Sequence, residues 1–311
     1  DFKGKDILLK SNSSALDTII NGVVYFLNRE SRDAVLDGFT IKGEGILCDK
    51  SSPTIKNSIF RENVGVYQGE FGGIISCESD IAEISASPLI KNNLFINNTL
   101  PGWWPLPGGA IACFGNASPE IVNNLMVRNH AAHPDSPLVG AITSYYYCPI
   151  KDPPMPCGIP NPKIINNTIA FNEHTNGLLY LYPTGAEGSF LEASPAMMVG
   201  VRNNIITDNN GYGLSGYFDG STIGYNDVWN NSLGNYDIPS GDQTGINGNI
   251  SFKPYFMSIA PDDFHLNYNS PGIDAGAPPD DYSLEPLPNG SRINQGNYGN
   301  SPQATKTYAC G

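Results

Sequence analysis

The chain has 311 residues, of which 40% are hydrophobic and 15% charged, and its formal net charge is −13. This length can bury a large core, and the acidic balance argues against nucleic acid and anionic membrane surfaces as partners. No apolar run is long enough to span a bilayer, whereas divalent cations, Ca²⁺ in particular, are compatible with the charge.

The first segment that reads as a strand is Asp6 to Leu9, and nothing amphipathic precedes it. A solenoid with a bare first coil exposes apolar side chains and unpaired strand backbone. We therefore expect either a truncated start or self-association through an uncapped N-terminal coil.

Further along, the sequence repeats one short pattern. The segment SPTIKNSIFREN at Ser52 returns as SPLIKNNLFINN at Ser87, SPEIVNNLMVRN at Ser118 and NPKIINNTIAFN at Asn161. Gly-rich segments such as GGIISC and GGAIAC alternate with these copies. Three short β-branched segments per repeat, separated by Asn, Gly and Pro, are typical of strands. They predict a parallel β-helix of roughly seven or eight coils over residues 1–249, followed by an irregular segment, residues 250–311, packed on the same domain.

The asparagines recur at two fixed places in each repeat. Equivalent residues of successive coils lie ~4.8 Å apart, so asparagines at one corner hydrogen-bond amide to amide along the stack. One ladder is expected to contain Asn57, Asn92, Asn123, Asn166 and Asn203. A second is expected to contain Asn63, Asn98, Asn129, Asn172 and Asn209. Between them, an interior aliphatic column is expected to contain Ile55, Ile90, Ile121, Ile164 and Val201.

The six cysteines fall into two groups. One interior column is expected to hold Cys48, Cys77, Cys113 and Ser144. Neighbouring in-register strands have poor disulfide geometry, so we expect these thiols to behave as small hydrophobic groups. Cys148 and Cys157 bracket the loop PIKDPPMP, where a local disulfide is favoured over free thiols and over a metal, and Cys310 has no assigned partner.

Sequence motifs for catalysis are missing. We find no metalloprotease, EF-hand or P-loop pattern and no paired-aspartate motif with a GHG, so no catalytic residue is assigned. The pair His130 and His133 lies three residues apart in the loop sequence HAAH, where a plain loop is favoured over a metal site.

The coil pattern GGxIxC…SPxIxNNxI…N resembles the right-handed parallel β-helix repeat proteins of the pectin-lyase-like superfamily, and more specifically their secreted bacterial members. The segments DDFHLNYNSPGIDAGAP at Asp262 and NGSRINQGNYGNSPQAT at Asn289 resemble the closing segment of such proteins. The resemblance implies an extracellular or cell-surface location, and it implies that any enzyme on this fold is a polysaccharide lyase or hydrolase.

Two features favour a polysaccharide as partner. Strand alternation places a strip of mostly basic residues on the outer face, beside the aliphatic column. The strip contains Lys56, Lys91, Glu120, Lys163 and Arg202. Aromatic loops carry Trp103, Trp104 and Tyr146, whose rings stack well on sugars. The alternatives are a solvated strand face that uses lysine against aggregation, and loops that fold back to cover the solenoid.

Three functions are compatible with these features. The first is a secreted, non-catalytic polysaccharide-binding or surface-matrix protein. The second is a lyase or hydrolase that acts on an acidic polysaccharide along the basic strip. The third is a structural subunit of a larger extracellular assembly. Fold alone does not choose among them.

Overall fold

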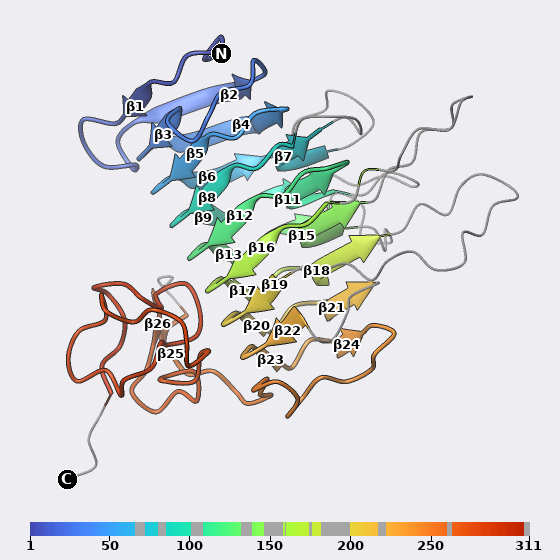
Figure 1. The fold of residues 1–311 in the computed structure, drawn as a ribbon, viewed down its shortest axis with the longest axis vertical. Coiled ribbons are helices and arrows are strands. Elements are labelled where there is room, and N and C mark those ends of the chain that lie inside the picture. The colour runs from blue at the N-terminus through green and yellow to red at the C-terminus, as the bar shows by residue number, and fades with distance from the viewer. Residues whose placement is uncertain are drawn as a thin grey trace, which may run out of the picture.

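The computed structural model describes residues 1–65, 72–79, 85–100, 108–131, 139–145, 158, 160–173, 176–181, 200–216, 222–259 and 263–307. Within these ranges the chain forms a stack of parallel β-coils with no α-helix, which confirms the predicted parallel β-helix (Figure 1). No helix in these ranges is long and apolar enough to cross a membrane.

The first sheet has eight parallel strands and receives one strand from each coil. In stacking order these are β1 (Leu8–Lys10), β3 (Val35–Asp37), β5 (Thr54–Lys56), β8 (Leu89–Lys91), β12 (Glu120–Val122), β16 (Lys163–Ile165), β19 (Gly200–Arg202) and β22 (Ile223–Gly224). The number of coils therefore agrees with the sequence prediction.

The other two faces of the coil join into one 14-stranded sheet. The second face contains β6 (Ile59–Asn63), β9 (Leu94–Ile96), β13 (Leu125–Val127), β17 (Thr168–Ala170), β20 (Ile205–Thr207) and β23 (Asp227–Trp229). The third face contains β7 (Gly72–Glu78), β11 (Gly108–Phe114), β15 (Val139–Tyr145), β18 (Asn176–Leu181), β21 (Tyr212–Gly216) and β24 (Gly234–Asp237).

Strand β4 (Thr40–Asp49) joins the second and third faces, because its first part pairs with β6 and its last part pairs with β7. Strand β2 (Ile19–Phe26) pairs along its whole length with β4. The bend in β4 falls at Gly43 and Gly45, with φ of 101° and 126°, and a Cβ on Gly45 would lie 2.0 Å from the carbonyl oxygen of Ile74. Only glycine fits such a left-handed bend with backbone this close.

Two short pairs complete the strands. Strands β10 (Thr99–Leu100) and β14 (His130–Ala131) are parallel, and β25 (Phe256–Ser258) and β26 (Asp263–Leu266) form an antiparallel hairpin in the C-terminal segment. Figure 1 shows that this hairpin lies beside the later coils.

The interior of the coils is filled by columns of stacked apolar side chains. The predicted aliphatic column is confirmed, since its members pair in register and each is 0% exposed. A column on the second face begins with Phe60 and Phe95, whose rings stack at 4.6 Å and 7°. Such in-register packing buries apolar area in every coil.

The predicted cysteine column is also interior. Cys48 pairs with Cys77, Cys77 with Cys113 and Cys113 with Ser144 along the third face. The three thiols are free and fully buried. Burial raises the pKa of the Cys48 thiol far above its ordinary value, and contact with Cys113 together with burial raises that of Cys77. These thiols therefore pack as neutral side chains.

The second predicted asparagine ladder is confirmed. Asn63 Nδ2 donates to Asn98 Oδ1 at 2.9 Å, and the same bond repeats in each later coil at 2.8 or 2.9 Å. The ladder continues beyond the prediction to Asn231.

The first predicted ladder is wrong by one residue. The continuous buried ladder consists of Asn93, Asn124, Asn167, Asn204, Asn226 and Asn249, with Ser58 donating its backbone N–H into the first member. All five predicted members take a left-handed φ between 53° and 59°, which carries the side chain outward, and each one from Asn92 onward directly precedes a ladder member. Asparagine tolerates this conformation better than most residues. In each Asn-Asn pair the first asparagine therefore serves the left-handed turn, and the second forms the ladder hydrogen bonds.

The outward asparagines do not form a continuous ladder. Asn92 donates to Asn57 at 3.4 Å and Asn203 donates to Asn166 at 3.1 Å. The row is interrupted at Asn123, whose Nδ2 instead donates to backbone carbonyls of the C-terminal segment.

The C-terminal segment packs against the side of the later coils. Phe264 is 1% exposed and joins a cluster with Ile96, Leu125, Val127 and Ala170 on the outer side of the second face. The backbone N–H of Gly296 donates to the Asn203 carbonyl at 2.8 Å. Hydrophobic and polar contacts thus anchor this otherwise irregular segment.

The N-terminal end is partly covered. Phe2 is 7% exposed and its ring lies 4.3 Å from that of Phe26, so an apolar side chain does precede β1, contrary to our expectation of a bare coil. Leu8 and Leu16 nevertheless stay 61% and 63% exposed. Self-association through this end stays a prediction.

We predict that Asn93→Leu lowers the free energy of unfolding by at least about 2 kcal/mol, because it leaves the buried Ser58 N–H without its acceptor and removes a hydrogen bond to the Ile55 carbonyl. Urea unfolding measures this change. The control Asn92→Gly, at the exposed neighbour whose left-handed φ glycine accepts, should stay within about 0.5 kcal/mol. Equal effects of the two substitutions would contradict the assignment of the ladder.

Candidate functional site

The predicted basic strip lies on the outer face of the first sheet, in two rows. Lys56 pairs with Lys91 in the row after the aliphatic column, and Arg202 belongs to the same row. Glu120 pairs with Lys163 in the row before that column. The structure thus places the five residues on one face of the sheet, but in two separate rows, one on each side of the aliphatic column.

Most charges of the strip are used within the protein. Lys56 Nζ lies 3.6 Å from Asp37, and Lys163 Nζ lies 3.5 Å from Glu120. Burial acts to raise the pKa of Glu120, but hydrogen bonding and charge from Arg32 and Lys163 bring it below its ordinary value. Among the described residues only Lys91 in the strip has no ion-pair partner. Use of the strip by a polysaccharide stays a prediction.

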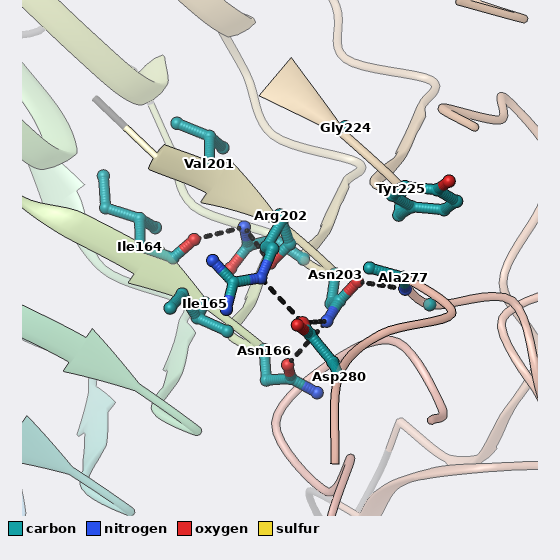
Figure 2. Close-up of polar contacts among 12 residues, drawn as sticks. Ile164, Ile165, Asn166, Val201, Arg202, Asn203, Gly224, Tyr225, Ala277 and Asp280 are labelled. Carbon is teal, nitrogen blue, oxygen red and sulfur yellow. Dashed lines mark hydrogen bonds and ion pairs between the residues drawn. The ribbon is translucent and has the colours of Figure 1, made fainter. Parts of the chain in front are cut away.

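The C-terminal segment covers the last charge of the strip. Asp280 Oδ2 accepts from Arg202 Nε and from Asn203 Nδ2, both at 2.7 Å (Figure 2). Asn203 Oδ1 accepts from the backbone N–H of Ala277 at 2.7 Å, and Asn203 also donates to Asn166. Arg202 is therefore part of a structural clasp that attaches the C-terminal segment.

Several candidates lie outside the described residues. These are Trp103, Trp104, Tyr146, Cys148, Cys157, His133 and Cys310. His130 is described, and its Nε2 lies 3.0 Å from Thr99 Oγ1 on the adjacent coil. No group of three or more His, Cys, Asp or Glu side chains in the described ranges is placed to hold a metal ion, and a role for Ca²⁺ stays a prediction.

The third face carries a row of residues that sequence analysis missed. Asp49, Glu78, Phe114 and Tyr145 pair in register on β4, β7, β11 and β15. Each follows a residue of the interior cysteine column. Successive strand side chains point to opposite faces, so this row points outward. It places two carboxylates and then two aromatic rings at intervals of about 4.8 Å.

The electrostatics of Glu78 set it apart from ordinary surface glutamates. Burial raises its pKa from 4.5 to about 7, the nearby charge of Asp49 adds to the shift, and a 2.7 Å hydrogen bond from Ser76 opposes it. Near neutral pH this carboxyl is therefore available in both protonation states, as a proton donor or acceptor must be.

The aromatic half of the row is accessible at Tyr145, which is half-buried, whereas Phe114 is buried. Phe114 is 3% exposed and its ring meets that of Tyr145 at 6.3 Å and 62°. In sequence, Trp103 and Trp104 lie shortly before β11, which carries Phe114. The alternation rule applied to the segments ILCD, ISCE, ACF and TSY would have found the row, because the residue after the cysteine position must face outward.

Comparison with known proteins agrees with this architecture. Residues 44–233 match a family model described as a right-handed beta helix region. No curated protein and no solved structure matches the chain.

We predict that Glu78→Gln changes how stability depends on pH. Between pH 4.5 and about 7 the folded protein holds a proton that the unfolded chain has lost, so the native protein loses stability as pH rises through this window. The variant lacks this loss and should be relatively more stable at pH 8, by up to about 3 kcal/mol.

Urea unfolding from pH 4 to pH 8 measures the difference. Glu44→Gln, at an exposed glutamate on β4, is the matched control and should follow the native curve. A Glu78→Gln curve that runs parallel to the native one would contradict the raised pKa.

Proposed function

The chain belongs to the right-handed β-helix family, and from this premise we propose that it is a non-catalytic polysaccharide-binding protein that acts outside the cell or at its surface. The observation that carries the proposal is the outward row of Asp49, Glu78, Phe114 and Tyr145. An extracellular setting is supported by the low share of charged residues, 15%, in a chain rich in Asn, Gly and Tyr.

The row has the chemistry that a sugar polymer requires. Aromatic rings such as Tyr145 offer a flat apolar face to the C–H groups of a sugar ring. Carboxylates such as Asp49 accept hydrogen bonds from sugar hydroxyls. A regular repeat along the solenoid lets successive units of one polymer meet successive strands, whereas a small ligand would use only one or two of them.

The third face is a better candidate than the basic strip. On the strip, Lys56, Lys163 and Arg202 already have carboxylate partners, and a ligand must replace those contacts. Displacing Asp280 from Arg202 would also disturb the clasp of the C-terminal segment.

We predict that Tyr145→Ala weakens retention on an immobilised polysaccharide about tenfold, through loss of one stacking platform. The double replacement of Trp103 and Trp104 by alanine should do the same with little change in Tm. Affinity electrophoresis with neutral and acidic polysaccharides measures retention. Tyr255→Ala, at a 48% exposed tyrosine of the C-terminal segment, is the control. Unchanged retention in both test variants would contradict a site on the third face.

A second candidate function rests on the two carboxylates. Glu78, with its raised pKa, suits a general acid, and Asp49 lies on the adjacent strand. Adjacent strands are about 4.8 Å apart, which is closer to the carboxyl separation of about 5–5.5 Å in retaining glycosidases than to the wider one of inverting enzymes. In a retaining reaction Glu78 protonates the leaving oxygen while Asp49 attacks the anomeric carbon, and water then releases the sugar.

We predict for this candidate that new reducing ends form with the α or β configuration retained, as seen by NMR immediately after cleavage. Glu78→Gln and Asp49→Asn should each abolish product formation but keep polysaccharide retention, whereas Lys91→Ala on the first sheet should leave both product formation and retention unchanged. Retention without any new reducing ends would exclude the hydrolase and leave the binding function in place.

A further inference from the structure

The C-terminal segment contains a groove of about 640 Å³. None of the residues of the row on the third face lines this groove. Its walls include Met257, Asp263, His265, Tyr268, Lys306 and Thr307. This volume falls in the range of about 300–1,000 Å³ that small-molecule sites occupy.

One side chain in the groove is held in a fixed orientation from two sides. His265 Nδ1 lies 2.5 Å from Asp263 Oδ1, and the imidazole stacks on the Tyr298 ring at 3.6 Å and 12°. Phe264 between them is buried in the apolar cluster, so the alternation of strand β26 turns Asp263 and His265 toward the opposite side. Packing of Phe264 thus fixes the hairpin that presents the pair.

The pair leaves one ring nitrogen for a ligand. Burial acts to raise the pKa of Asp263, but hydrogen bonds from His265 bring it below its ordinary value, so the carboxylate is ionised and can only accept. Nδ1 therefore carries the hydrogen, and in the neutral ring Nε2 is an acceptor. Among the described residues Nε2 has no hydrogen-bond partner.

The remaining walls indicate the class of ligand. Tyr268 and Met257 are 54% and 56% exposed and supply apolar surface. Lys306 is an exposed donor, while Asp263 and His265 Nε2 are acceptors. A ligand rich in hydroxyl groups matches this mixture, because each hydroxyl both donates and accepts and the C–H face of a sugar ring packs on tyrosine.

We propose that this groove is a second saccharide site, in which His265 Nε2 accepts a hydrogen bond from a sugar hydroxyl while the ring face packs on Tyr268. The site is built entirely from the C-terminal segment. It is independent of the row on the third face.

Titration with cellobiose, maltose and digalacturonate, followed through the His265 ring C–H signals by NMR, tests the proposal. At least one disaccharide should shift these signals saturably. His265→Phe keeps a ring to stack on Tyr298 but removes Nε2, and it should weaken that disaccharide about tenfold in calorimetry, as should Tyr268→Ala. Tyr255→Ala, at an exposed tyrosine that does not line the groove, should bind it as the native protein does.

Two results would overturn the proposal. One is the absence of a saturable shift with all three disaccharides. The other is undiminished binding in both His265→Phe and Tyr268→Ala. Loss of binding in Tyr145→Ala alone would assign the disaccharide to the third face and overturn the separate site.

Discussion

The carboxamide stack at the two corners is the interaction on which the rest of the structure depends. Asn167 is representative: its Oδ1 accepts from the backbone N–H and the side chain of Asn124, and its Nδ2 donates to Asn204 Oδ1 and to the Ile121 carbonyl. Backbone groups that a sharp corner would leave buried and unpaired are thereby satisfied without water. Because these bonds require the spacing of neighbouring strands, every other row of side chains is brought into register with them.

That register divides the molecule into surfaces with different roles. Interior rows stack like with like, as in the thiols of Cys48, Cys77 and Cys113. On the first sheet the outward rows are largely taken up by ion pairs and by the clasp between Arg202 and Asp280. On the third face the same stacking places Asp49 beside Glu78, and the charge of Asp49 adds to the rise in the Glu78 pKa that burial causes. One repeat therefore produces a structural face and a chemically distinctive face.

The fold could be predicted from the sequence because its signals are local and repeated. Gly, Asn and β-branched residues recur at fixed places, so the coils, the interior columns and the ladder through Asn63 followed from pattern alone. The other ladder was displaced by one residue, because Asn92 and Asn93 look alike in sequence and differ only in φ and in the direction of the side chain.

The candidate sites were harder to predict, because their properties arise from contacts between residues far apart in the chain. Nothing in the sequence around Glu78 shows that its carboxyl group is largely buried. Similarly, nothing around Arg202 shows that Asp280, 78 residues later, accepts its hydrogen bond. The orientation of His265 depends on Tyr298, which follows it by an irregular stretch with no periodic pattern.

The ladder bonds join residues separated by 35, 31, 43, 37 and 22 positions, yet their lengths stay at 2.8 or 2.9 Å. Geometry at the corners is thus uncoupled from the length of chain between them, and a connecting loop can gain or lose twenty residues without disturbing the next coil. Such a scaffold suits diversification by insertion, because new recognition loops can be acquired one coil at a time. The two asparagine ladders keep the coils in register whatever the length of these loops. Engineered peptides grafted between coils would inherit the same tolerance.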